Sequence, residues 1–236
     1  LLDRVGDDFR PAYVAGHSLG EFTALTAAGA LDFDDGLNLV RRRGELMRDA
    51  GDVSPGGMAA ILGLDADVVA ALCDEVAAET GGVLVVANDN CPGQIVIAGD
   101  ETSLEKSTVL ARDKGAKRAM RLPVSIAAHS PLMEHVATDF REALAATTFH
   151  DPNTLVIGNT TAEPLSGVDA IRDELGAQLT SPVRWTESVR VMLADGVGTY
   201  LEFGSKDVLT GLLRRIDRSA TGIVLENPEG FDSLAV

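Results

Sequence analysis

The chain has 236 residues, of which 45% are hydrophobic and 4% aromatic, and its formal net charge is −16. This length and apolar content suit one large domain or two small ones with a real core, and no apolar run is long enough to cross a membrane. The strong negative charge argues against nucleic acid as a partner, because the phosphate backbone repels an acidic surface.

The first clear pattern along the chain is an apolar strand, a sharp turn and an Ala-rich helix. The turn is Gly16-His17-Ser18-Leu19-Gly20, which fits the G-x-S-x-G pattern of a nucleophile elbow. Such a turn is strained and exposes the serine hydroxyl, and a side chain at either glycine is expected to collide with neighbouring backbone. Free N–H groups at the start of the helix can stabilise a negatively charged oxygen. The spacing therefore predicts that Ser18 is a nucleophile rather than part of a structural turn.

A Ser-Pro-Gly-Gly break at residues 54–57 separates two kinds of element pattern. Beyond it the order is β-α-β-β-α-β, the ferredoxin-like arrangement. The expected elements there are strands 58–64, 83–87, 94–98 and 116–122, helices 65–80 and 101–114, and a polar turn at 88–93. We therefore expect a ferredoxin-like small subdomain over residues 55–122, inserted in a larger domain that is formed by residues 1–54 and 123–236.

The larger domain alternates short apolar strands with helices. This alternation predicts a parallel sheet that helices cover on both faces. The elements expected after the small subdomain are strands 155–158 and 199–203 and helices 130–146, 170–179, 184–194 and 208–216. The fold class is therefore α/β, with a hydrolase-like parallel sheet in the larger domain.

A serine nucleophile requires a base, and the four histidines of the chain are the candidates. His129 lies where the chain leaves the small subdomain and enters a helix, and clefts form between domains. His135 lies within a helix and His150 in a polar loop, while His17 adjoins Ser18 and reaches it awkwardly. Position alone therefore favours His129 as the base.

The segment Gly16-His17-Ser18-Leu19-Gly20-Glu21 resembles the signature of the malonyl-CoA:acyl-carrier-protein transacylases and of the related acyltransferase domains of polyketide synthases. Further motifs resemble this family in the same order, from residue 13 to residue 227. They are Arg43-Gly44-Glu45-Leu46-Met47, Met58-Ala59-Ala60-Ile61, residues 92–99, Pro123-Val124-Ser125 with His129-Ser130 and Leu132-Met133, Gln178-Leu179 with Pro182-Val183 and Trp185, and Phe203-Gly204 with Val208-Leu209-Thr210-Gly211-Leu212. Several ordered motifs are far more specific than one five-residue pattern.

The resemblance implies a role for each site residue. Ser18 would attack the thioester of malonyl-CoA and carry the malonyl group as an ester, and His129 would move the proton. In this family a main-chain carbonyl orients the histidine, and the matching residue is Gln178. The backbone N–H of Leu19 would be one oxyanion donor. The family draws the other from a Gly-Gln-Gly loop upstream of the serine, so we expect that N-terminal sequence is missing, and residues 1–6 read as the end of a helix.

Arg43 matches the arginine that holds the malonyl carboxylate in this family. A guanidinium can meet a carboxylate with two parallel charged hydrogen bonds, which supports that role on physical grounds. The alternative is a surface arginine, which we expect for Arg41 and Arg42. The resemblance also places Asn88 and Asn90 in the cleft, where they would contact coenzyme A or the acyl group; a turn-forming role is equally open.

The resemblance further implies malonyl-CoA and acyl carrier protein as partners, with coenzyme A as part of the substrate, no cofactor and no metal. We expect a monomer. A cytoplasmic location is expected because Cys73 and Cys91 set no disulfide framework and suit a reducing compartment, and Cys73 fits a helical core position. The acidity suits either a high-salt cytoplasm or an ordinary one. A basic cluster on the small subdomain is either a contact for acidic carrier protein or a solvated face. Its residues are Arg112, Lys114, Lys117 and Arg118.

Two other function classes stay open at this point. One is a Ser-His thioesterase or esterase on a related scaffold, in which Arg43 would have no substrate carboxylate to bind. The other is an inactive fragment that only docks carrier protein. The absence of an attached linker favours a stand-alone fatty-acid enzyme over an excised synthase domain, and Ile126-Ala127-Ala128 does not decide between malonyl and methylmalonyl groups.

Overall fold

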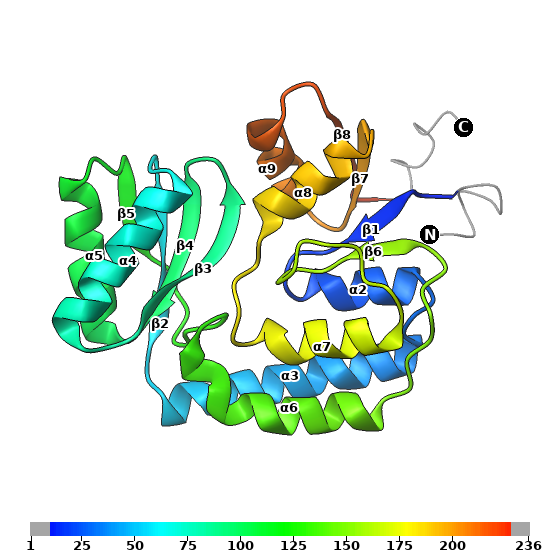
Figure 1. Ribbon diagram of the computed structural model, residues 1–236, viewed down its shortest axis with the longest axis horizontal. Helices are drawn as coiled ribbons and strands as arrows, with labels where there is room; N and C mark the ends of the chain where they lie inside the picture. Colours follow the sequence, from blue (N-terminus) through cyan, green and yellow to red (C-terminus); the bar gives the residue numbers. More distant parts are fainter. Residues whose placement is uncertain (1–9, 228–236) are drawn as a thin grey trace.

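The computed structural model describes residues 10–227, which form two units that lie side by side (Figure 1). The smaller unit lies at the left of the view and the larger unit at the right. The helix end expected at residues 1–6 lies outside the described residues. None of the helices that are described is long and apolar enough to cross a membrane.

The larger unit combines short parallel strand pairs with helices. Its strands are β1 (Tyr13–Ala15), β6 (Leu155–Ile157), β7 (Thr199–Phe203) and β8 (Thr221–Leu225). Its helices are α2 (Gly20–Ala27), α3 (Phe33–Val53), α6 (Glu134–Ala146), α7 (Val168–Gln178), α8 (Trp185–Ala194) and α9 (Val208–Ile216), and the short 3₁₀ turn η1 (Pro131–Met133) precedes α6. β1 pairs in parallel with β6, and β7 with β8. The parallel pairing agrees with the expected α/β class, and β8 is a strand that the sequence patterns do not predict.

The smaller unit is an antiparallel sheet with two helices on one face. Its strands are β2 (Gly57–Leu62), β3 (Leu84–Cys91), β4 (Gln94–Gly99) and β5 (Arg118–Arg121), and its helices are α4 (Ala66–Thr80) and α5 (Glu101–Asp113). The strand order is β3-β4-β2-β5. Gly81, with a φ of 67°, ends α4, and Asp100 begins α5 by accepting a hydrogen bond from the Ser103 N–H. Cys73 is buried in the core between helices and sheet, as predicted.

The segment expected as a polar turn, residues 88–93, is mostly strand. The backbone N–H of Asp89 donates to Val183 O, and that of Val183 donates to Ala87 O, each at 2.9 Å. These partners lie far away in the sequence, and they satisfy backbone groups that a turn would leave open. Long-range pairing therefore overrides the turn propensity of Asn and Asp here. The turn shrinks to the residues around Gly93, whose φ is 72°.

Side chains also fasten the β3–β4 hairpin to the larger unit. Arg215 of α9 donates to Gln94 Oε1 at 2.7 Å and to Pro92 O at 3.0 Å. Thr186 of α8 donates to Asp89 Oδ1 at 2.5 Å. The hairpin is thus hydrogen-bonded to both α8 and α9, and these bonds fix the position of the two units relative to each other.

The three longest helices of the larger unit form its main core with α2. α3, α6 and α7 lie next to one another beneath the strands (Figure 1). Phe22 of α2 packs edge-on against Phe140 of α6, with ring centroids 6.2 Å apart, and both rings are buried. Because α2 follows Ser18 and α6 follows His129, this contact aligns the helices that come after the two candidate catalytic residues.

We expect Phe140→Ala to lower the free energy of unfolding by about 3–5 kcal/mol, because it removes a fully buried ring and leaves a cavity. Urea unfolding followed by circular dichroism measures this. Leu37→Ala is the control: Leu37 of α3 is 58% exposed, so its loss should change stability by less than about 0.5 kcal/mol. A similar, small effect of both variants would show that the Phe22–Phe140 contact does not hold the helices together.

Candidate active site

The G-x-S-x-G turn lies between β1 and α2. Ser18 has a φ of 53°, a left-handed conformation that costs a non-glycine residue about 1–3 kcal/mol. A Cβ at Gly16 would lie 1.9 Å from Gly20 O, so this position requires glycine. A collision is also expected for a side chain at Gly20, and this prediction is wrong. A Cβ there would meet nothing within 4 Å, because Gly20 is partly exposed at the start of α2.

The structure brings Ser18 and His129 together from positions 111 residues apart. Ser18 Oγ lies 2.9 Å from His129 Nε2, and His129 Nδ1 lies 2.8 Å from the backbone oxygen of Gln178. His129 also has a left-handed backbone, with a φ of 59°, and is 4% exposed. Of the other histidines, His135 and His150 are exposed on the surface. The segment before His129 packs against the face of the small sheet that α4 and α5 leave free.

The hydrogen bonds of His129 fix its protonation. A carbonyl oxygen only accepts, so the ring carries its proton on Nδ1 and donates it to Gln178 O. The unprotonated Nε2 then faces the Ser18 hydroxyl. Burial and the positive charge of Arg43 lower the pKa of His129 to about 4. The ring is therefore neutral at pH 7 and able to accept a proton from Ser18.

Arg43 reaches the same serine from α3. Its Nη2 donates to Ser18 Oγ at 2.9 Å, and its Nε donates to Gln178 Oε1 at 3.1 Å. The side chain is 5% exposed, and burial lowers its pKa to about 10, so it stays charged at pH 7. Arg41 and Arg42 lie on the exposed side of α3 and pair with surface carboxylates, as expected. Unlike them, Arg43 makes no ion pair within residues 10–227, which leaves a buried cation next to the candidate nucleophile.

The two asparagines of β3 differ in their contacts. Asn90 is 9% exposed, and its Oδ1 lies 2.8 Å from His17 Nε2, so it borders the elbow. The His17 ring lies 5.6 Å from the ring of Trp185, and burial lowers the pKa of His17. Asn88 is also buried, but no hydrogen bond joins its side chain to the other candidate residues.

Two residues that hold the elbow, Asn159 and Glu21, are not predicted from the sequence. Asn159 Oδ1 accepts from the Ser18 N–H at 2.6 Å, and its Nδ2 donates to Gly16 O at 2.7 Å. Glu21 is fully buried and accepts from the Asn159 N–H at 2.9 Å and from Gln178 Nε2 at 2.5 Å. The place of Asn159 in the sequence could have indicated its role. It follows β6, and the carboxyl ends of the parallel strands β1 and β6 lie at the same edge of the sheet, next to the elbow.

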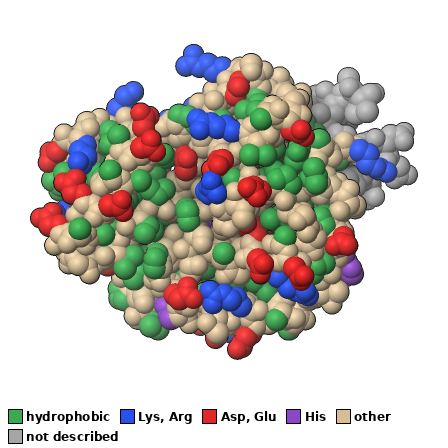
Figure 2. Space-filling model, in the orientation of Figure 1, with side chains coloured by type: hydrophobic (Ala, Val, Ile, Leu, Met, Phe, Trp, Pro, Cys, Tyr) green, Lys and Arg blue, Asp and Glu red, His purple; other side chains and the backbone are tan. Residues whose placement is uncertain are grey.

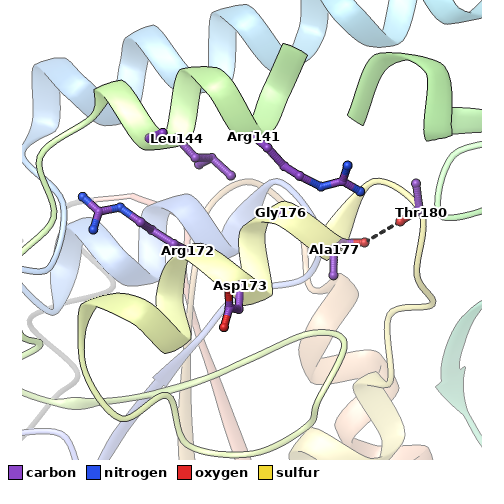
Figure 3. A pocket seen from close by; sticks show the side chains of 8 residues that line it. Arg141, Leu144, Arg172, Asp173, Gly176, Ala177 and Thr180 are labelled. Carbon is purple, nitrogen blue, oxygen red and sulfur yellow. Dashed lines mark hydrogen bonds between the residues drawn. The ribbon is translucent and has the colours of Figure 1, made fainter. Parts of the chain in front are cut away.

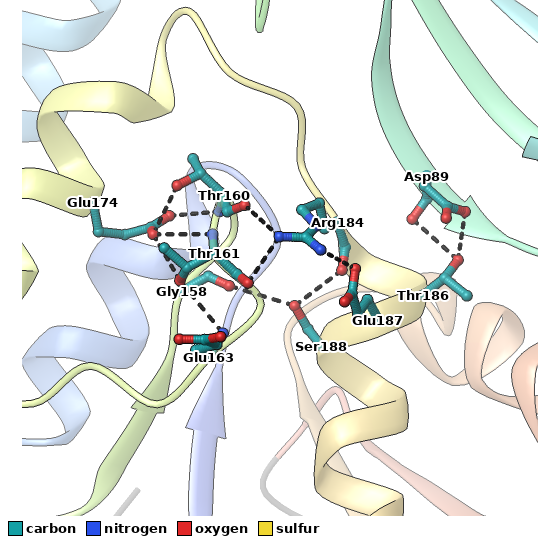
Figure 4. A network of polar contacts seen from close by, with 10 residues as sticks. All are labelled: Asp89, Gly158, Thr160, Thr161, Glu163, Glu174, Arg184, Thr186, Glu187 and Ser188. Carbon is teal, nitrogen blue, oxygen red and sulfur yellow. Dashed lines mark hydrogen bonds and ion pairs between the residues drawn. The ribbon is translucent and has the colours of Figure 1, made fainter. Parts of the chain in front are cut away.

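A second buried carboxylate, Glu174 of α7, holds the loop that carries Asn159. It accepts from Thr160 N–H at 2.6 Å and from the hydroxyls of Thr160 and Thr161 at 2.8 and 3.1 Å. From the other side, Arg184 donates to Thr161 O at 3.0 Å, and these side chains converge on the loop in Figure 4. The loop is thus fixed from both α7 and the start of α8.

The Leu19 backbone N–H lies at the point where α2 begins. Within residues 10–227 it has no hydrogen-bond acceptor, and the Leu19 side chain is 50% exposed. A free amide beside Ser18 is what an oxyanion donor requires.

A surface groove between α6 and α7 lies apart from these residues. It has a volume of about 380 Å³ and is lined by Arg141, Leu144, Ala145, Arg172, Asp173, Gly176, Ala177 and Thr180. Figure 3 shows the two arginines directed toward opposite ends of the groove. None of the candidate site residues lines it, so it gives no access to Ser18.

Comparison with known proteins gives consistent matches over most of the chain. The acyl transferase domain family matches residues 1–224. Malonyl CoA-acyl carrier protein transacylase of Bacillus subtilis (strain 168) is 44% identical over 222 residues, which cover 94% of this chain and 70% of that protein. The crystal structure of the acyl-carrier-protein S-malonyltransferase of Burkholderia pseudomallei 1710b has a TM-score of 0.92 at 45% identity, covering 96% of this chain and 73% of the other. A malonyl-transacylase solved with its type II PKS acyl-carrier protein has a TM-score of 0.94 at 37% identity, covering 98% and 74%.

The lowered pKa of His129 predicts how the reactivity of Ser18 depends on pH. Labelling of Ser18 by a fluorophosphonate should keep its full rate from pH 7 down to about 5 and fall to half near pH 4, because the base stays neutral until then. Arg43→Met should move the midpoint up toward 6.5, since it removes a positive charge that disfavours protonation. A wild-type midpoint at or above 6.5 would contradict this account of the ring.

Proposed function

The chain belongs to the acyl transferase domain family, and we propose that it moves malonyl groups from coenzyme A to acyl carrier protein through an ester on Ser18. The resemblance noted in its sequence motifs is confirmed by these matches. Its activity is that of a malonyl CoA-acyl carrier protein transacylase, as the similar Bacillus subtilis protein is named, and we propose that it serves fatty-acid synthesis. The observation that carries the proposed chemistry is the meeting of three groups at one atom: Ser18 Oγ lies 2.9 Å from both His129 Nε2 and Arg43 Nη2.

The first half-reaction loads Ser18. His129 Nε2 takes the hydroxyl proton as Oγ attacks the thioester carbonyl of malonyl-CoA, and the Leu19 N–H stabilises the oxyanion. The intermediate then collapses, the C–S bond breaks, and the coenzyme A thiolate takes the proton back from Nε2. Proton transfer by a positioned base is worth roughly 10²–10⁴-fold in rate.

The second half-reaction repeats these steps with the phosphopantetheine thiol of the carrier protein. His129 takes the thiol proton, the sulfur attacks the ester carbonyl, and Ser18 leaves with that proton. Gln178 O orients His129 without a carboxylate, so the proposed site is a dyad rather than a triad. Its chemistry uses coenzyme A only as part of the substrate.

Arg43 is the proposed partner of the malonyl carboxylate. A buried carboxylate without a partner would cost several kcal/mol, and so would a buried guanidinium that stays unpaired. When a malonyl group binds, its carboxylate and the Arg43 guanidinium pair with each other, which removes both costs. An acetyl group has no carboxylate and leaves the guanidinium unpaired. The unpaired charge of Arg43 therefore favours carboxyacyl groups over plain acyl groups.

We also propose the finer organisation of the fold. The β-α-β-β-α-β order and the strand order β3-β4-β2-β5 support a ferredoxin-like unit over residues 55–122. Residues 1–54 and 123–236 would form the hydrolase-like core, which the parallel β1–β6 and β7–β8 pairs support.

Acyl carrier protein and malonyl-CoA are the proposed partners of a cytoplasmic monomer. A carrier protein is bound in the solved complex of a similar transacylase. Within the basic cluster, Lys114 pairs with Glu75 and Arg112 donates to Ala119 O. This leaves Lys117 and Arg118 as the better placed cations for an acidic partner. Acidic side chains are spread over both units on the face that Figure 2 shows.

Intact-mass analysis after incubation with malonyl-CoA tests the ester. The wild type should gain one malonyl group, Ser18→Ala should gain none, and carrier protein with a phosphopantetheine arm should discharge the ester faster than water does. Rapid discharge by water alone would indicate a thioesterase. Carrier binding without any ester would indicate a docking fragment.

Arg43→Ala tests the carboxylate role. We expect malonyl transfer to fall by about 10²–10³-fold and acetyl transfer to change far less, because the variant removes the partner of a carboxylate that the acetyl group lacks. Initial rates with malonyl-CoA and acetyl-CoA measure the ratio. Arg41→Ala is the control on the same helix, since that side chain is 79% exposed and should leave both rates unchanged. Equal loss of both activities in Arg43→Ala would refute the role.

A further inference from the structure

Glu21 is a fully buried carboxyl group beside the dyad that touches none of the reacting atoms. Both of its oxygens accept hydrogen bonds: Oε1 from the Asn159 N–H at 2.9 Å and Oε2 from Gln178 Nε2 at 2.5 Å. Burial and the negative charge of Glu174 raise the pKa of Glu21, whereas the hydrogen bonds from Gln178 and Asn159 favour its ionised form. Burying a carboxyl group is energetically costly, so the role of Glu21 is sought in the hydrogen bonds that it makes.

Glu21 decides which way the Gln178 amide faces. Gln178 Nε2 donates to Glu21 Oε2 and to Ser18 O, at 2.5 and 3.1 Å. Its Oε1 is therefore left to accept from Arg43 Nε at 3.1 Å. The flipped amide would set its NH₂ group against the Arg43 N–H and its oxygen against two acceptors, so no bond of the set would survive.

The amide in turn aims Arg43. Because Gln178 Oε1 engages Nε, the two terminal nitrogens of the guanidinium are not needed for that bond, and one of them, Nη2, lies 2.9 Å from Ser18 Oγ. The two terminal nitrogens of a guanidinium form a fork of N–H groups that a carboxylate accepts. A turned or tilted guanidinium would offer the acyl group one donor instead of two.

We propose that Glu21 is a positioning residue that fixes the Gln178 amide and so aims Arg43 at the carboxylate of the acyl group, which makes it a determinant of carboxyacyl selectivity. The inference rests on the proposed malonyl transfer. It assigns Glu21 no contact with substrate, because its oxygens are already occupied by Asn159 and Gln178.

Glu21→Gln tests the proposal, because it keeps the volume and replaces one of the two accepting oxygens by an NH₂ group that cannot accept. We expect kcat/KM for malonyl-CoA to fall by about 10- to 100-fold, mainly through KM, while acetyl transfer and fluorophosphonate labelling of Ser18 stay within about threefold. In an Arg43→Ala background the same change should have no further effect on the malonyl-to-acetyl ratio. Parallel loss of malonyl transfer, acetyl transfer and labelling would reduce Glu21 to a structural role.

Glu174→Gln is the matched control. Glu174 is also a buried carboxyl near the site, but it holds Thr160 and Thr161 rather than the Gln178 amide. Its variant should keep the malonyl-to-acetyl ratio of the wild type. If Glu21→Gln does not fold, Glu21→Asp keeps the carboxyl group, is one methylene too short to reach Gln178, and should show the same loss of selectivity.

A readout that does not depend on transfer separates this inference from the proposed function. The Arg43 Nε–H proton, assigned by its loss in Arg43→Ala, should exchange slowly with solvent in the wild type and at least about tenfold faster in Glu21→Gln. Unchanged exchange would overturn the inference even if malonyl transfer is normal. Faster exchange in a protein that forms no malonyl ester would uphold the positioning of Arg43 and refute the proposed function instead.

Discussion

The site depends on the hydrogen bonds of one buried residue, Gln178, at the C-terminal end of α7. Its backbone oxygen accepts from His129 Nδ1, its Oε1 accepts from Arg43, and its Nε2 donates to Ser18 O. These bonds reach the candidate base, cation and nucleophile, which come from three separate parts of the chain. The packing of α7 against α6 therefore sets the geometry of the whole site, because a shift of the last turn of α7 would break all three bonds together.

Burial gives the polar groups of the site their strength. In a desolvated site the pKa of His129 and that of Arg43 fall, while that of Glu21 rises. Each shift reflects the cost of holding a charge away from water. The group that stays charged and can pair with an incoming substrate is Arg43, because the oxygens of Glu21 already accept from Asn159 and Gln178. Desolvation thus links the fold to the proposed choice of acyl group.

The smaller unit contributes to the site through two contacts. One face of its sheet supports the segment that ends at His129, and Asn90 of β3 holds the His17 ring beside Ser18. Both contacts require that the units keep their relative position. The backbone pairing of β3 with Val183 and the bonds of Arg215 to the hairpin serve this purpose. The strained backbones of Ser18 and His129 persist because these surroundings leave them no alternative.

The sequence by itself determined the order of most helices and strands, the strained elbow around Ser18, and the family, because these are written in local spacing and in motifs of adjacent residues. It also singled out His129 and Arg43, whose catalytic roles stay predictions until the variants are measured. Only the tertiary structure decided that residues 88–91 form a strand and that Glu21 and Asn159 hold the elbow. The physical reason is distance along the chain. The partners of these two residues lie 138, 141 and 157 positions away, and no local pattern of side chains specifies which distant donor a buried acceptor will meet.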